Sequence, residues 1–135
     1  MKTRLAAAAS VALLAACAGG APRRGASALD EYLPYAGPAV ASFHFFRLDG
    51  WYSVDDAHVV IETAINTAYL ITLYAPCPEL GFTERLGLTS TAGTVSHFEA
   101  VIVRDYHRCP IAEMRPLDVR RMRAERLAAH ASGPR

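Results

Sequence analysis

The sequence predicts a mainly β protein, built as a small antiparallel barrel or sandwich with one disulfide and a C-terminal helix. Short apolar and aromatic segments recur about every eight to twelve residues with turn signals between them, and no helical period separates them. The chain holds three cysteines, two of them within this β region. A chain of 135 residues, 52% of them hydrophobic, has room for one compact domain and not for two.

The N-terminal segment has the composition of an export signal. Lys2 and Arg4 precede an uncharged apolar run over residues 5–16. As a helix this run would extend about 18 Å, which is too short for a hydrocarbon core of about 30 Å. Residues 1–16 are therefore predicted to be a signal peptide that is removed after export.

The run ends in Leu14, Ala15, Ala16 and Cys17, and this quartet resembles the lipobox of bacterial lipoproteins. The resemblance implies a diacylglyceryl group on the Cys17 thiol, cleavage just before it, and acylation of the new amino terminus, with palmitate as the expected acyl group. Ala18 in place of Asp implies sorting to the outer membrane, facing the periplasm. The alternative is an ordinary secretory signal that leaves Cys17 as a spare thiol.

The rest of the chain divides into three parts. Residues 17–28 are rich in Gly and small residues and predict a flexible tether. Residues 29–115 are predicted to form the disulfide-stapled β domain, whose charge is acidic. Residues 116–135 are predicted to form a basic helical tail.

The strands are predicted from apolar runs bounded by turn residues. Residues 29–40 predict a short helical turn and then an extended segment. Asn66 can adopt the left-handed conformation of a tight loop, so the runs on either side of it form the clearest hairpin. The apolar pattern changes face near Ala100 and Val101, which predicts a bulge. The predicted strands are 43–48, 51–54, 58–63, 68–74, a weaker 82–88, 94–104, and a last short strand with Ile111 and Met114.

The C-terminal helix is predicted to begin at Asp118, a good N-cap residue, and to run to about His130. We expect its arginines to project toward an anionic partner, either the acidic body of the protein or a negatively charged envelope surface. A solvated helix is the alternative, because exposed ion pairs contribute only about 0 to 1 kcal/mol each. The arginines are Arg120, Arg121, Arg123 and Arg126.

Cys77 and Cys109 are predicted to form a disulfide. Export places both in an oxidising compartment, and they are the two thiols that remain once Cys17 is assigned to lipid. The alternative, a catalytic or metal-binding thiol pair, lacks the C-x-x-C spacing typical of such sites.

Both of these cysteines precede proline, in Cys77-Pro78-Glu79-Leu80 and Cys109-Pro110-Ile111. Together with the lipobox and the aromatic strand of Trp51, this layout resembles a family of short proteobacterial lipoproteins of unassigned function. The resemblance covers residues 43–117. It implies a shared scaffold in the cell envelope and carries no reaction, so no catalytic residue is transferred.

Two polar clusters are candidates for chemistry. Asp105, His107 and Cys109 alternate along a segment that would put an acid, an imidazole and a thiol on one face of a strand. The alternative is a solvated loop beside a disulfide.

The second cluster is Asp55, Asp56 and His58, which follow Trp51 and Tyr52. Two carboxylates and an imidazole can hold a cation or act as general acid and base. The alternative is a turn, because Asp-Asp is a common turn composition and no calcium-loop spacing follows.

These observations favour a cell-envelope lipoprotein that is a non-catalytic binding or structural module with no cofactor and no metal. Its expected partners are the membrane, through the lipid anchor, and an envelope protein or glycan that meets exposed aromatics such as Trp51 and Tyr52. The sequence lacks a phosphate-binding Gly-rich loop, a nucleophile elbow and a nucleic-acid motif, so no nucleic-acid partner is expected. The alternative function is a periplasm-facing hydrolase or metal-dependent enzyme built from the Asp/His clusters.

Overall fold

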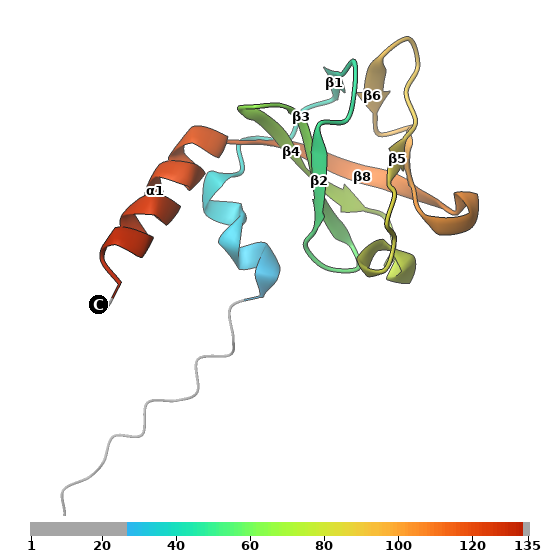
Figure 1. The fold of residues 1–135 in the computed structure, drawn as a ribbon. Coiled ribbons are helices and arrows are strands. Elements are labelled where there is room, and N and C mark those ends of the chain that lie inside the picture. The colour runs from blue at the N-terminus through green and yellow to red at the C-terminus, as the bar shows by residue number, and fades with distance from the viewer. Residues whose placement is uncertain (1–26, 134–135) are drawn as a thin grey trace, which may run out of the picture.

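A computed structural model describes residues 27–133, apart from the side chain of Asp105. The predicted signal peptide, Cys17 and most of the predicted tether lie outside the described residues. The described chain folds into two antiparallel sheets, and the larger one curls into a half barrel (Figure 1). The mainly β fold with one disulfide and a C-terminal helix is therefore confirmed.

The six-stranded sheet has the order β2-β3-β4-β8-β7-β5. Its strands are β2 (Gly50–Ser53), β3 (His58–Ala64), β4 (Thr67–Leu73), β8 (Arg108–Leu117), β7 (Ala100–Ile102) and β5 (Gly87–Leu88). A two-stranded sheet pairs β1 (Ser42–His44) with β6 (Thr94–Ser96). The described chain also has short 3-10 helices: η1 (Ala28–Glu31) and η2 (Leu33–Tyr35) precede β1, η3 (Pro78–Gly81) lies between β4 and β5, and η4 (Arg104–Tyr106) lies between β7 and β8.

The β3–β4 hairpin forms as the sequence predicts. Its two-residue loop is Ile65-Asn66, and the register pairs Ile61 with Tyr69 and Val60 with Leu70. Because side chains alternate along a strand, Val59 and Ile61 enter one core cluster, while Val60 enters another on the opposite face of the sheet. Both faces of this hairpin are therefore covered.

The first core cluster lies between the six-stranded sheet and the β1–β6 pair, and it contains both disulfide cysteines. The second cluster lies under η1, η2 and the start of the C-terminal helix α1 (Val119–Ala131). Asp118 caps α1 as predicted, since its carboxylate accepts a hydrogen bond from the Arg121 N–H at 3.0 Å. The helix docks through Val119 and Met122, which are buried. No helix of the described part of the chain is long and apolar enough to cross a membrane.

Four predicted strands have different lengths in the structure. The predicted strand 43–48 is paired over β1 alone, Ser42–His44. The predicted strand 94–104 is two strands, β6 and β7, because residues 97–99 turn and the Glu99 carboxylate accepts hydrogen bonds from the Thr89 and Thr91 hydroxyls. The change of face at Ala100 and Val101 therefore marks the start of β7 and not a bulge.

The other two differences concern the segments around the hollow described below. The predicted strand 82–88 is paired only over β5, Gly87–Leu88. The predicted short last strand is β8, which has ten residues and bonds to β4 along one edge and to β7 along the other. β8 reaches Leu117 and so passes the predicted start of the helical tail at residue 116.

Candidate functional site

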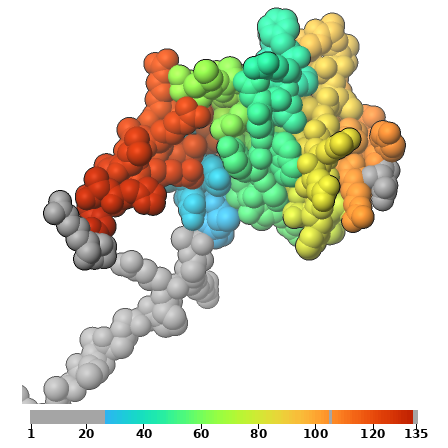
Figure 2. Space-filling view, viewed as in Figure 1, coloured from blue at the N-terminus to red at the C-terminus, as the bar shows by residue number. Residues whose placement is uncertain are grey.

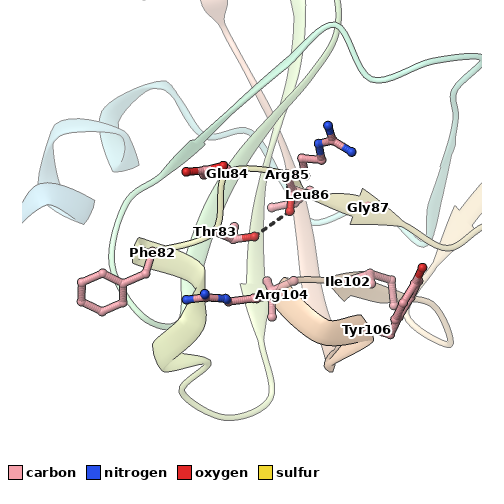
Figure 3. Close-up of a pocket in the computed structure, with 10 residues that line it drawn as sticks. Phe82, Thr83, Glu84, Arg85, Leu86, Gly87, Ile102, Arg104 and Tyr106 are labelled. Atoms are coloured by element: carbon pink, nitrogen blue, oxygen red, sulfur yellow. Dashed lines mark hydrogen bonds between the residues drawn. The ribbon is translucent and has the colours of Figure 1, made fainter.

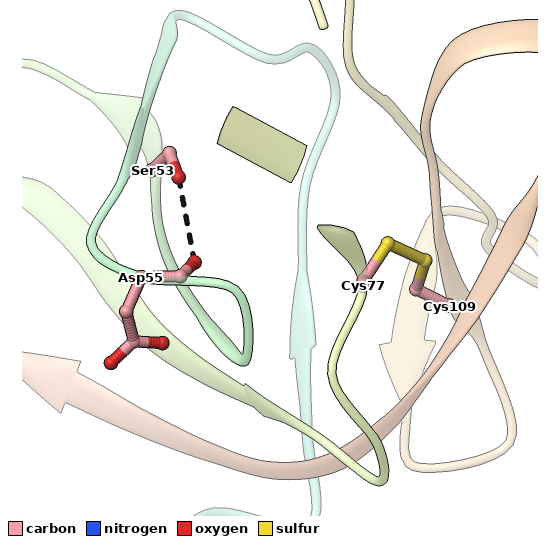
Figure 4. Close-up of a disulfide and its surroundings, with 4 residues drawn as sticks. All are labelled: Ser53, Asp55, Cys77 and Cys109. Atoms are coloured by element: carbon pink, nitrogen blue, oxygen red, sulfur yellow. Dashed lines mark hydrogen bonds between the residues drawn. A yellow bond between two sulfur atoms is a disulfide. The ribbon is translucent and has the colours of Figure 1, made fainter. Parts of the chain in front are cut away.

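The disulfide between Cys77 and Cys109 joins the segment after β4 to β8 (Figure 4). Both cysteines are almost fully buried, with 1% and 4% of their surface exposed, and their Cα atoms are 6.2 Å apart. The Cys77 N–H also donates to the carbonyl of Asp56 at 2.6 Å. The disulfide is therefore part of the core and holds Cys77 to β8. The hydrogen bond holds the same residue to the turn before β3.

His107 lies next to this disulfide. A ring nitrogen of His107 and the two sulfurs lie within 4.8 Å of one another. Both sulfurs are used in the S–S bond, so the three residues do not form a thiolate metal site in this oxidised chain. Asp105 belongs to η4 and not to a strand, so Asp105, His107 and Cys109 do not alternate along one strand as the sequence suggested.

The second predicted cluster is divided by the structure. The Asp55 carboxylate accepts a hydrogen bond from the Ala57 N–H at 2.8 Å and lies 2.8 and 2.9 Å from Nδ1 of His58. The Ser53 hydroxyl donates to the Asp55 carbonyl at 3.4 Å (Figure 4). Asp56 is exposed, and its backbone carbonyl accepts the hydrogen bond from the Cys77 N–H. Asp55 and His58 therefore organise the turn between β2 and β3.

This Asp–His pair could orient an imidazole for acid–base chemistry. Within the described side chains, however, no hydroxyl or thiol bonds to the second ring nitrogen of His58. Neither Asp55 nor His58 lines the hollows described below. The structure thus brings two of the three predicted residues together without a partner for them to activate.

Asp55→Asn is expected to reduce the loss of stability that the protein suffers in acid. Burial opposes ionisation of Asp55, but the hydrogen bonds from Ala57 and His58 outweigh it and lower the pKa of the carboxyl. Its contribution is therefore complete above the unfolded-state pKa of about 4 and is lost as the pH falls through the lower folded-state pKa.

The carboxyl of Asp55 is 37% exposed, so screening by solvent keeps this contribution below about 1 kcal/mol. The measurement is the melting temperature near pH 7 and near pH 3, because carboxyl groups titrate between roughly pH 3 and pH 5. The drop between the two should be smaller in Asp55→Asn, and Asp56→Asn should keep the wild-type drop. Equal profiles for all three proteins would contradict the assignment.

A hollow lies between residues 82–87 and residues 102–106. These two segments are at the side of the molecule remote from α1 (Figures 1 and 2). The volume of the hollow is about 590 Å³, within the roughly 300–1,000 Å³ of small-ligand sites. Figure 3 shows the two chain segments as opposite walls. The lining residues are Phe82, Thr83, Glu84, Arg85, Leu86, Gly87, Ile102, Val103, Arg104 and Tyr106.

Aromatic and charged side chains stand at the rim of this hollow. Phe82 is 81% exposed and Tyr106 is 90% exposed, although both are large. Arg104 extends from its wall toward Phe82 (Figure 3). Among the described side chains, neither Arg85 nor Arg104 has an acid within ion-pair distance. The hollow therefore offers guanidinium donors that no described acid pairs with, close to exposed aromatic rings.

A second hollow of about 210 Å³ adjoins the first and shares Phe82 and Arg104 with it. Its other lining residues are Pro78 and Glu79. One carboxylate oxygen of Glu79, Oε2, is buried and has no hydrogen-bond partner among the described residues. Because a buried acceptor without a partner costs about 1 to 3 kcal/mol, this oxygen is a ready site for a ligand donor.

The disulfide connects the two walls of the hollow. Cys77 directly precedes η3, which leads into Phe82, and Cys109 follows Tyr106 by three residues. Gly87 of one wall pairs with Ile102 of the other. A Cβ at Gly87 would stand 3.2 Å from the Ile102 Cβ, so glycine permits this close approach. Sequence reasoning missed the site, for which the only signal was aromatic and arginine residues in the weakly predicted strand 82–88 and around the end of the predicted strand 94–104.

The arginines of α1 are largely engaged within the protein. Arg121 bonds to Glu125 at 2.8 Å and lies over the Tyr35 ring, whose hydroxyl donates to Glu125 at 2.5 Å. Arg126 lies over the ring of Tyr32. Arg123 donates to the side chain of Asn66 at 3.2 Å. These contacts fix the helix against η1, η2 and the β3–β4 loop.

The aromatics named from the sequence occupy different settings. Trp51 is partly buried and packs against the first core cluster, so it contributes to stability. Tyr52 is exposed, and its hydroxyl lies 3.4 Å from the Glu62 carboxylate, to which it donates. Neither lines the hollow between residues 82–87 and 102–106.

A family model described as a family of unknown function, DUF6491, matches residues 1–133. The chain belongs to this family. No curated protein and no solved structure matches this DUF6491 chain. Family membership agrees with the predicted resemblance to a family of unassigned function, while lipid attachment and a proteobacterial origin stay predictions for the DUF6491 chain.

Proposed function

We propose that this DUF6491 chain is a lipid-anchored protein of the cell envelope that acts as a non-catalytic binding module. Its binding site is the hollow between residues 82–87 and residues 102–106. The observation that carries the proposal is one hollow with exposed Phe82 and Tyr106 at its two ends (Figure 3), an apolar floor, and Arg104, which has no acid within ion-pair distance among the described side chains. Ligand sites are typically concave and mainly apolar, with a few polar groups that fix orientation.

The floor of the hollow is apolar, and its rim carries exposed aromatic and charged side chains. Leu86, Ile102 and Val103 supply the apolar floor, and Val103 is almost fully buried. Contiguous exposed apolar surface marks interaction sites, and this floor lies between the exposed rings of Phe82 and Tyr106 at the two ends of the hollow (Figure 3). The hydrogen-bonded Asp55–His58 pair lies in another turn, so acid–base chemistry and the hollow do not coincide.

The position of the hollow suits a protein held by its N-terminus. The described chain begins beside η1, and η1, η2 and α1 lie on one side of the sheet (Figure 1). The η4 wall of the hollow lies on the other side. An anchor at Cys17 would therefore leave the hollow accessible from the periplasm.

The proposal is tested with small molecules released from cell envelopes by enzymatic digestion and added to the purified mature protein. A ligand at roughly ten times its Kd should add about 1.4 kcal/mol to the stability, which raises the melting temperature by several degrees. Phe82→Ala and Tyr106→Ala should abolish the increase. Phe98→Ala is the matched control, because Phe98 is 84% exposed and lies outside the hollow.

Two results would contradict the proposal. One is the absence of any fraction that raises the melting temperature of the wild-type protein. The other is an increase that Phe98→Ala removes as completely as Phe82→Ala does, because the stabilising contact would then lie elsewhere.

A further inference from the structure

We propose that the hollow binds a saccharide that carries an acetamido group, with Phe82 and Tyr106 against the sugar faces and Arg104 and Glu79 as its polar partners. This inference rests on the proposed function and names the ligand class of the same site. It treats the two adjoining hollows as one site, because Phe82 and Arg104 line both.

The aromatic side chains favour a flat ligand with C–H groups on its faces. Phe82 and Tyr106 expose 81% and 90% of their surface and stand at opposite ends of the hollow, so each can meet a different ring of an oligosaccharide (Figure 3). An aromatic face carries partial negative charge, so it attracts the positively polarised C–H groups of a sugar ring as well as excluding water from them. A pyranose ring presents such C–H groups on its faces and hydroxyls at its edge.

The polar side chains require a ligand that both donates and accepts hydrogen bonds. Arg104 has donors only, and an ionised Glu79 carboxylate has acceptors only. In the part of the chain that the structure describes, buried Glu79 Oε2 has no hydrogen-bond partner and Arg104 has no acid within ion-pair distance. An acetamido group supplies an N–H for the carboxylate and a C=O for the guanidinium, and hydroxyls can do the same.

The charge of the site disfavours a polyanion or a fatty acyl chain. Two glutamates, Glu79 and Glu84, stand beside Arg85 and Arg104 in the combined lining, so the formal charges cancel. A polyanion would meet both carboxylates. An acyl chain would leave the Arg104 guanidinium and the Glu79 carboxylate facing apolar atoms, which costs free energy.

The walls are fixed before a ligand arrives. Tyr106 has φ +60°, a left-handed conformation that is unfavourable for a bulky residue. The backbone around it is closed by hydrogen bonds, from Val103 N–H to His107 C=O at 3.0 Å and from His107 N–H to Arg104 C=O at 3.2 Å. The Cys77–Cys109 bond ties this turn to the η3 wall. A preformed site loses less entropy when a ligand binds.

The test is a titration of the purified mature protein with the disaccharide of N-acetylglucosamine, followed by NMR shifts of the Phe82 and Tyr106 rings. Dodecyl phosphate is titrated in parallel as an anionic, apolar probe. We expect the disaccharide to bind and to shift both rings. Phe82→Ala and Glu79→Gln should each weaken its binding about tenfold or more. The control variants Phe98→Ala and Glu113→Gln, whose side chains are exposed outside both hollows, should bind as the wild type does.

The outcomes separate this inference from the proposed function. If envelope digests stabilise the protein through Phe82 but the disaccharide does not bind, the saccharide inference is wrong and the binding module stands. Binding of dodecyl phosphate alone leads to the same conclusion. Disaccharide binding that is unchanged in Phe82→Ala and Glu79→Gln, with melting temperatures equal to those of the controls, also overturns the inference. Failure of both digest and disaccharide overturns the two proposals together.

Discussion

Cys77→Ser and Cys109→Ser are each expected to lower the free energy of unfolding by roughly 2 to 5 kcal/mol. The two cysteines are separated by 32 residues in sequence, and a closed loop of this length restricts the unfolded chain by an estimated 3 to 4 kcal/mol. Such a loss is a large share of the roughly 5 to 15 kcal/mol that stabilises a typical domain. Chemical denaturation of the purified, non-reduced variants measures it.

The double variant is expected to be no less stable than either single one, because each single substitution already removes the whole bond. Ser53→Ala is a control with a modest expected effect, since the exposed Ser53 hydroxyl makes only a 3.4 Å bond to the Asp55 carbonyl. Additive losses in the double variant, or two free thiols in the wild-type protein isolated without reductant, would contradict the disulfide assignment.

The same substitutions should weaken ligand binding in the hollow. The bond joins the η3 wall to the β8 segment that follows η4, so its removal lets the distance between Phe82 and Tyr106 vary. Binding measured well below the melting temperature separates this effect from unfolding. The experiment tests whether the Cys77–Cys109 disulfide, which the sequence predicted, supports the hollow, which the sequence did not predict.

The parts of the fold that depend on local patterns could be predicted from the sequence. The hairpin of β3 and β4 follows from two apolar runs around Asn66, and the N-cap of α1 follows from Asp118. In both cases the deciding interactions lie within a few residues of one another. The disulfide was also predictable, because composition left two thiols in the described β region.

The lengths of the other strands depend on partners distant in sequence. The sequence predicts a last strand only around Ile111 and Met114, yet β8 also contains Pro110, which pairs with Ala100 on one side and accepts a hydrogen bond from the Tyr74 N–H on the other. Pro lacks an N–H but keeps its carbonyl acceptor, which is the group this position uses. Residues 82–86 have the composition of a strand but no strand partner in the described chain, and they form a wall of the hollow instead.

The hollow could not be derived from the sequence, because its walls are brought together by tertiary contacts. The pairing of Gly87 with Ile102 and the Cys77–Cys109 bond place residues 82–87 opposite residues 102–106. Nothing local distinguishes Phe82 or Tyr106 from the aromatics that enter the core, such as Phe43, which is 4% exposed. Only the fold separates an aromatic residue that is packed from one that is displayed.

Cys17→Ser is expected to abolish lipid attachment completely. By its resemblance to a lipobox, the quartet Leu14 to Cys17 directs acylation to the Cys17 thiol, and a serine hydroxyl is a much weaker nucleophile. Loss of the anchor removes about 0.8 kcal/mol for each buried CH₂, summed over two or three chains. The measurement is incorporation of labelled palmitate in cells, together with the size of the protein, since the variant should also keep residues 1–16.

Two matched variants sharpen this prediction. Cys77→Ser should keep the palmitate label, because its thiol lies in the folded domain and not in the quartet. Ala18→Asp should keep the label but move the protein from the outer to the inner membrane, as the sorting resemblance implies. If Cys17→Ser is still cleaved and released in soluble form, residues 1–16 act as an ordinary secretory signal. The proposed binding module would then meet its ligand as a protein without a membrane anchor, and the bilayer would not orient its hollow.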